Sequence, residues 1–159
     1  MKTLDYLHLD ASNAGKIVNS LQQLLADFQV YYTNLRGFHW NIQGKEFFTL
    51  HSKFEEMYDD TTEKADEIAE RILMLGGTPA NKFSDYLKTS KVKEVSNITK
   101  GNDAIKNILD TLGLLIEEER KILAEASEAE DESTVALMSD YLKEQEKTVW
   151  MLVAYSTGE

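Results

Sequence analysis

Histidine and carboxylate side chains recur along the first half of the chain at spacings that suit a metal ion. His51 and Glu55 are four residues apart, as are Asp66 and Glu70, so each pair shares one face of a helix. Imidazole and carboxylate groups together bind iron and other first-row metals. The chain has no cysteine, which excludes thiolate metal sites and thiol catalysis. The histidines are His8, His39 and His51.

The two pairs cannot bind one ion within a single subunit. Glu55 and Asp66 are close to three whole helical turns apart, so both pairs face nearly the same way. His51 and Asp66, however, lie about 22 Å apart along a helix. Two copies of this helix, packed antiparallel about a two-fold axis, would place His51 and Glu55 opposite the partner's Asp66 and the partner's Glu70. His39, at the end of the preceding helix, could join from the side.

The Glu-x-x-His motif with which a single helical bundle holds two iron ions is absent. Arg36 and Phe48 occupy the positions three residues before His39 and His51. Any metal site in this chain must therefore be built in another way.

Each candidate ligand also has an ordinary structural explanation. Asp66 and Glu70 lie in a strongly charged stretch, residues 59–71, which is typical of a solvated helix face. His39 and His51 are flanked by aromatic residues, as packed histidines often are. Composition and spacing alone leave both explanations open.

Hydrophobic spacing predicts the elements that position these residues. The single proline, Pro79, leaves most of the chain free for long helices. Apolar residues repeat at steps of three and four in four segments, and no segment has the alternation of a strand. The last segment begins with two good capping residues, Ser133 and Thr134. The apolar stripes run from Ile17 to Phe38, from Phe47 to Leu75, from Ile105 to Leu123 and from Val135 to Leu152.

The lengths of the links predict how these helices connect. About four residues, 41–44, join the first two, which makes them antiparallel neighbours. Residues 76–97 form a far longer link, which can run back along the second helix, about 45 Å, with room for a short helix around 83–87. Two antiparallel hairpins joined by one long crossover have ferritin-like connectivity. The sequence therefore predicts an all-α, ferritin-like four-helix bundle in one domain, residues 1–159.

Composition narrows the function classes further. Lys and Arg number 17 against 28 Asp and Glu, so the formal net charge is −11. A protein this acidic is not expected to hold DNA through its own positive field. No apolar run approaches the ~18 residues of a membrane span, and the first residues lack the apolar core of a signal peptide. We expect a cytoplasmic protein without a membrane partner.

Several motifs resemble the Dps family, the mini-ferritins named for protecting DNA during starvation. The resemblance covers nearly the whole chain, and its most specific part is the spacing of the candidate ligands. Residues 146–152 are also similar to the last helix of the family. The other motifs are Gly37-Phe38-His39-Trp40-Asn41-Ile42, Phe48-x-x-His51-x-x-x-Glu55, Asp66-x-x-x-Glu70-Arg71 and Leu75-Gly76-Gly77.

The resemblance implies a homododecameric shell with di-iron ferroxidase centres at its two-fold interfaces. His39, His51 and Glu55 of one subunit would bind iron together with the partner's Asp66 and the partner's Glu70. Fe(II) would be oxidised to Fe(III), preferentially by hydrogen peroxide, and the ferric mineral stored inside would protect against oxidative stress. Many relatives carry Asp at position 55, and Glu55 keeps that charge while reaching one methylene further.

The resemblance also gives expectations outside the ligand set. Trp40 would lie beside the site, where the tryptophan of the family can take up a stray oxidising equivalent; packing in the core is the alternative. Acids at the start of the last helix either line three-fold pores for Fe(II) or form a solvated helix end. Ala136 stands where many relatives carry a carboxylate. The acids concerned are Glu125, Glu128, Glu130, Asp131 and Glu132.

DNA binding is not expected, although the family name suggests it. DNA-binding members often carry a Lys-rich tail, whereas only Lys2 precedes Lys16 here and the chain ends with residues 156–159, STGE. The rival hypothesis is a non-catalytic shell or scaffold that binds DNA or a protein, with a vestigial metal site. The ferroxidase hypothesis is favoured because all five candidate ligands are metal-binding residue types.

Overall fold

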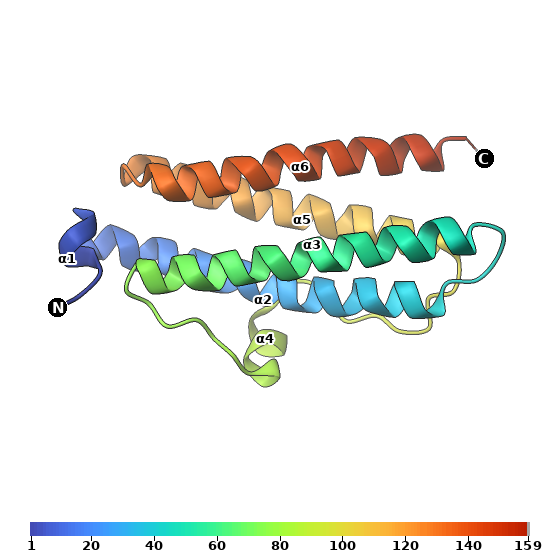
Figure 1. Cartoon of the computed structure of the whole chain (residues 1–159), viewed down its shortest axis with the longest axis horizontal. Coiled ribbons are helices and arrows are strands. Elements are labelled where there is room, and N and C mark those ends of the chain that lie inside the picture. Colours follow the sequence, from blue (N-terminus) through green and yellow to red (C-terminus); the bar gives the residue numbers. More distant parts are fainter. Residues whose placement is uncertain (159) are drawn as a thin grey trace.

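Four long helices lie side by side along the molecule, as the apolar stripes predict (Figure 1). The computed structural model describes residues 1–158, and within that range it holds helices and no strand. Among residues 1–158, none of the helices combines the length and the apolar content needed to cross a bilayer. The helices are α1 (Leu4–Leu7), α2 (Ala11–Asn41), α3 (Phe47–Met74), α4 (Phe83–Thr89), α5 (Gly101–Glu128) and α6 (Glu132–Ser156).

The connectivity confirms the prediction of a ferritin-like bundle. α2 and α3 form one antiparallel hairpin, and α5 and α6 form the other (Figure 1). The link between α3 and α5 crosses from one end of the bundle to the other along the outside of α2. The short helix expected around residues 83–87 is present within this link as α4.

Polar side chains of α2 hold the crossover in place. The carboxylate of Asp27 is fully buried and accepts hydrogen bonds from the Ser90 hydroxyl at 2.9 Å and from the backbone N–H of Lys91 at 2.6 Å. The side chain of Asn34 donates to the carbonyl of Lys93 at 2.9 Å. These bonds satisfy backbone groups of an irregular segment that has no ladder of its own.

The start of α6 differs from the prediction. Asp131, rather than Ser133 or Thr134, is the N-cap, because its carboxylate accepts from the backbone N–H of Thr134 at 3.1 Å. Asp131 is only 2% exposed and forms an ion pair with Arg71 at 2.7 Å. Asp131 is thus committed within the subunit and leaves the set of acids that could line a pore.

The other difference is at the beginning of the chain. A single helical turn, α1, precedes α2, and its Leu4 packs against the hydrophobic core. The sequence did not predict this turn, since four residues are too few for a periodic pattern to emerge.

Candidate metal centre

The structure brings His39 and His51 together at the turn between α2 and α3. Their rings are stacked, with centroids 3.8 Å apart and planes at 13°. His39 Nδ1 lies 2.7 Å from the carbonyl oxygen of His51, and His51 Nδ1 lies 2.7 Å from the carbonyl oxygen of His39. Since a carbonyl can only accept, each Nδ1 carries a proton and donates it. With the proton on Nδ1, the lone pair of a neutral ring is on Nε2, which is the tautomer of a metal ligand whose other nitrogen is held by an acceptor.

Aromatic contacts fix the orientation of the two imidazoles. Phe47 stacks on His51 with a centroid distance of 4.9 Å and an interplanar angle of 18°. Tyr58 meets His39 edge-on, with a centroid distance of 5.3 Å. His39 is 8% exposed, and His51 is half-buried. The packed-histidine explanation is thus correct for the rings, and it leaves both Nε2 atoms available.

An arginine and two further aromatic residues extend this cluster along α2. The guanidinium of Arg36 lies 4.7 Å from the ring centroid of Trp40 and 5.2 Å from that of Tyr32. Trp40 is 63% exposed, so packing in the subunit core is not its role. Arg36, Tyr32 and Tyr58 are not among the candidate site residues predicted from the sequence. The four-residue steps from Tyr32 to Arg36 and from Arg36 to Trp40 are the signal that places these three residues on one face of α2.

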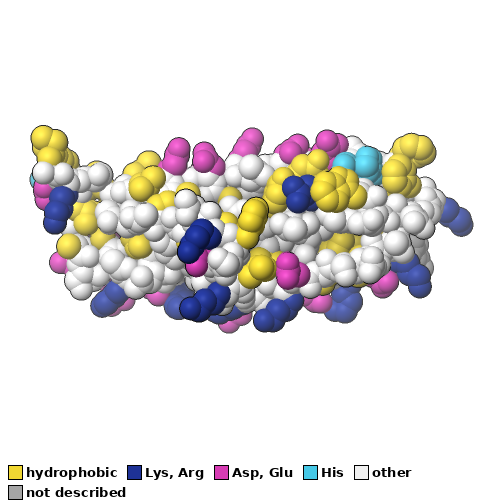
Figure 2. All heavy atoms as spheres, turned by 90° about the horizontal axis from the view of Figure 1, so that it is seen from below, with side chains coloured by type: hydrophobic (Ala, Val, Ile, Leu, Met, Phe, Trp, Pro, Cys, Tyr) yellow, Lys and Arg dark blue, Asp and Glu magenta, His cyan; other side chains and the backbone are white. Residues whose placement is uncertain are grey.

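Acidic neighbours shape the electrostatics beside the histidines. Partial loss of hydration, and then the charges of Glu55 and Asp59, raise the pKa of the Tyr58 hydroxyl, which keeps it a neutral phenol. Glu55 is exposed one turn beyond His51 on α3. In Figure 2, histidine side chains lie at the upper edge of the molecule near one end, beside hydrophobic side chains. A row of acidic side chains continues along the same edge.

The structure does not bring Asp66 and Glu70 to the histidines. Both side chains are exposed toward the other end of α3, where Asp66 lies about 22 Å and Glu70 about 28 Å from His51 along the helix. Within residues 1–158 of one subunit, no group of three or more His, Asp or Glu side chains is placed to hold a metal ion. A subunit on its own thus offers a histidine group and a distant carboxylate group.

The carboxylate end of α3 is anchored by the residue next to Glu70. Arg71 is buried, and its Nε donates to the Thr134 hydroxyl at 2.9 Å while its Nη2 contacts Asp131 at 2.7 Å. Asp66 borders a surface cleft of about 450 Å³ between α2, α3 and the crossover. The backbone that carries the two acids is thus held by α6, while their side chains remain free to meet another molecule.

Comparison with known proteins gives a consistent set of relatives. The ferritin-like domain model matches residues 18–157. The chain is 53% identical over 156 residues to the DNA protection during starvation protein of Porphyromonas gingivalis, covering 98% of both chains. It is 36% identical over 140 residues to DNA protection during starvation protein 2 of Bacillus anthracis, covering 88% of this chain and 96% of that one.

A solved structure of a relative has the same fold as this chain. The crystal structure of the DPS protein from Vibrio cholerae O1 superposes with a TM-score of 0.91 at 51% identity, covering 92% of both chains. That protein is described as a member of a broad superfamily of ferritin-like diiron-carboxylate proteins.

Proposed function

The chain belongs to the Dps family of ferritin-like proteins, and on that premise we propose that it oxidises Fe(II) at di-iron sites shared by two subunits and stores the ferric product in a hollow shell. The observation that carries the proposal is the His39–His51 pair. Each ring presents Nε2 as a free donor atom, in a subunit that supplies too few further ligands to complete the site.

A second copy can supply the missing ligands. An antiparallel pairing of two α3 helices sets His51 and Glu55 of one subunit against the partner's Asp66 and the partner's Glu70. The exposure of all three acids supports this arrangement, because none of them is committed within its own subunit. The complete set is two imidazoles and three carboxylates, with His39 as the second imidazole.

This ligand set suits the oxidation of iron. Imidazole and carboxylate bind both Fe(II) and Fe(III), and two irons held roughly 3.5–4 Å apart can supply two electrons together. Each of two Fe(II) ions loses one electron, and hydrogen peroxide with two protons takes both electrons to form two water molecules. No hydroxyl radical is released in this two-electron step, which is how the reaction would protect against oxidative stress.

The proposal extends to assembly and location. The shell would be a homododecamer in the cytoplasm, and its acidic inner surface and pores would receive Fe(II) as substrate. Trp40, which is exposed beside Arg36, would accept a stray oxidising equivalent from the site.

Mixing two inactive variants tests whether the site is shared. One variant lacks the histidines, His39→Ala with His51→Ala, and the other lacks the carboxylates, Asp66→Ala with Glu70→Ala. When they are unfolded together and reassembled at random, half of the dimers are mixed, and each mixed dimer regains one intact site of two. About a quarter of the wild-type rate of Fe(II) oxidation should return, measured by stopped-flow with hydrogen peroxide and separately with oxygen.

Controls separate the shared site from other causes. His8→Ala and Asp103→Ala, mixed in the same way, should keep the wild-type rate, because neither residue is a proposed ligand. The mass of the reassembled shell confirms subunit exchange. No recovery after confirmed exchange would contradict the shared site, and a wild-type protein as slow as the histidine variant would indicate a non-catalytic shell. A rate with oxygen equal to that with peroxide would contradict the peroxide preference.

A further inference from the structure

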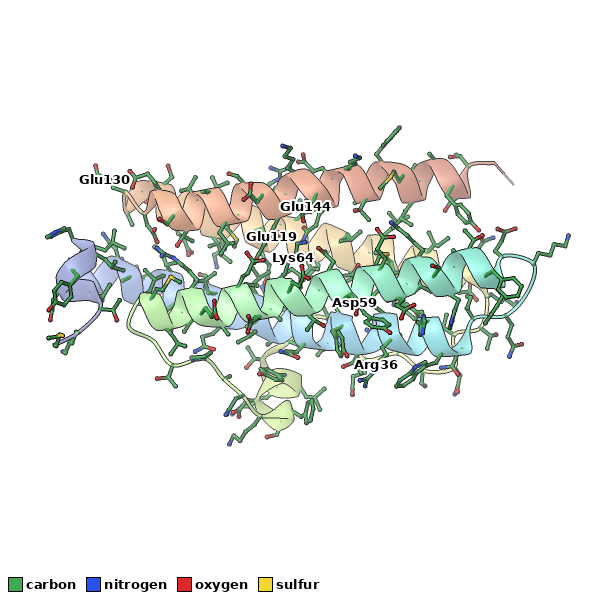
Figure 3. All side chains as sticks on the ribbon, in the orientation of Figure 1. Arg36, Asp59, Lys64, Glu119, Glu130 and Glu144 are labelled. Carbon is green, nitrogen blue, oxygen red and sulfur yellow. The ribbon has the colours of Figure 1, made fainter. Side chains whose placement is uncertain are left out.

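A polar cluster interrupts the hydrophobic core halfway along the bundle. Each long helix contributes one member: Tyr31 from α2, Lys64 from α3, Glu119 from α5 and Gln145 from α6. All four are buried, and Glu119 is 0% exposed. Figure 3 shows Glu119, Lys64 and Glu144 gathered near the middle of the bundle. Four polar residues at one level of a packed core are costly unless their polar atoms find partners.

The ammonium of Lys64 is already occupied. Its Nζ lies 2.7–2.8 Å from the two carboxylate oxygens of Asp60 and 2.6 Å from the carboxylate of Glu144. These contacts join α3 to α6 at the surface end of the cluster. Lys64 therefore neutralises one of these two acids and makes no hydrogen bond to Glu119.

Four buried oxygens of the cluster lack a partner among residues 1–158. They are the hydroxyl oxygen of Tyr31, both carboxylate oxygens of Glu119 and the amide oxygen of Gln145. Burial raises the pKa of the Glu119 carboxyl to about 8, although the nearby Gln145 amide and the charges of Lys64 and Arg120 act in the opposite direction. Orphaned oxygens from three helices call for a positive or hydrogen-donating group between them.

A cavity lies beside the cluster. It has a volume of about 250 Å³, and Tyr31, Lys64 and Gln145 of the cluster are among its lining residues. Glu56, Asp60 and Glu144, all exposed, also line it. Acids around an opening raise the local concentration of cations. The volume exceeds that of several water molecules, each with a share of about 30 Å³, so a partly hydrated ion fits.

We propose that each subunit binds one hard divalent cation in its bundle core, through Glu119, the amide oxygen of Gln145 and the hydroxyl oxygen of Tyr31. Carboxylate, amide and phenol oxygens suit Mg²⁺, Mn²⁺ or Fe(II), whereas a softer ion prefers sulfur or nitrogen. When ionised, the carboxylates of Glu119, Asp60 and Glu144 carry three negative charges, and Lys64 carries one positive charge. A divalent ion balances the remaining two negative charges. The site is separate from the histidine pair, and no Glu-x-x-His motif contributes to it.

Crystals of the whole protein soaked in Mn²⁺ test the site directly. Manganese is identified by its anomalous scattering, and we expect one peak within bonding distance of the Glu119 carboxylate in every subunit. The peak should persist in His39→Ala with His51→Ala, which removes ligands of the proposed iron site. It should disappear in Glu119→Gln, which keeps the shape of the side chain, and remain in Glu117→Gln, a neighbouring exposed acid.

Electron paramagnetic resonance of free Mn²⁺ gives the same test in solution. Glu119→Gln should lose one bound ion per subunit relative to both wild type and Glu117→Gln. Water molecules alone at the Glu119 position, with manganese visible elsewhere in the shell, would overturn the proposal. If Glu119→Gln does not fold, the wild-type crystal decides by itself. Because the histidine variant is part of the test, failure of this core site and failure of the shared iron site are distinguishable.

Discussion

The two ends of α3 carry the two halves of the proposed iron site, and they are built in opposite ways. At the histidine end, two reciprocal hydrogen bonds and the stacked rings of Phe47, His51 and His39 hold each ligand in one tautomer and one orientation. At the carboxylate end, Asp66 and Glu70 are exposed, and only the neighbouring Arg71 is anchored. An imidazole offers a metal one lone pair in one direction, so its ring must be fixed. A carboxylate has about four acceptor positions and tolerates freedom until the partner arrives.

The largest expected effect comes from removing the fixed half. His39→Ala with His51→Ala should slow Fe(II) oxidation by more than about 100-fold, beyond the 10–100-fold typical of losing a hydrogen-bond partner of a ligand. The helices should remain, because neither ring belongs to the apolar stripe. Stopped-flow oxidation and circular dichroism measure the two effects, and His8→Ala is the matched control. A double variant that oxidises iron at the wild-type rate would show that the histidines are not ligands.

The anchor of the carboxylate half should matter for stability. Arg71→Met leaves Asp131 as a buried charge without its ion-pair partner, so the free energy of unfolding should fall by about 3 kcal/mol. Chemical denaturation at one fixed protein concentration measures the loss. Lys106→Met breaks an exposed ion pair with Asp110 and should cost less than about 1 kcal/mol. Equal losses in the two variants would mean that α6 does not anchor this end of α3.

A milder change tests how strictly the histidine half must be fixed. Phe47→Leu removes the stacking partner of His51, and an aromatic contact contributes about 1 kcal/mol beyond its buried area. At limiting Fe(II), the rate of oxidation should therefore fall about fivefold. Phe83→Leu changes an exposed phenylalanine of the crossover and should leave the rate unaltered. A wild-type rate for Phe47→Leu would show that the two hydrogen bonds suffice to orient the ring.

The smallest expected effect concerns DNA, because the chain as a whole is acidic. With a net charge of −11, the protein should not retard duplex DNA at physiological salt. A gel-shift titration without divalent metal measures this. A tight complex that weakens as salt rises would show a cationic surface that neither half of the site accounts for.

The sequence by itself determined the four helices, their two hairpins and the long crossover. Apolar steps of three and four residues show a helix wherever burial is one-sided, and Pro79 with two glycines before it marks where α3 must end. Local spacing also grouped His51 with Glu55 and Asp66 with Glu70, because residues four apart on a helix are neighbours. The distance of about 22 Å between His51 and Asp66 along one helix excluded a metal site within a single subunit, and it too follows from local helical geometry. The full ligand set came from resemblance to the Dps family and remains a prediction.

Only the tertiary structure decided how residues distant in sequence meet. The reciprocal bonds of His39 and His51, the ion pair of Arg71 with Asp131 and the burial of Asp131 all depend on two helices meeting in one register. Glu119 and Gln145 fall on the apolar stripes of α5 and α6, so spacing alone could place them inside the bundle. Their meeting with Tyr31 and Lys64 depends on how the four helices pack. Helical spacing describes one helix at a time, whereas hydrogen bonds, orphaned oxygens and cavities arise between helices, where packing rather than pattern sets the distances.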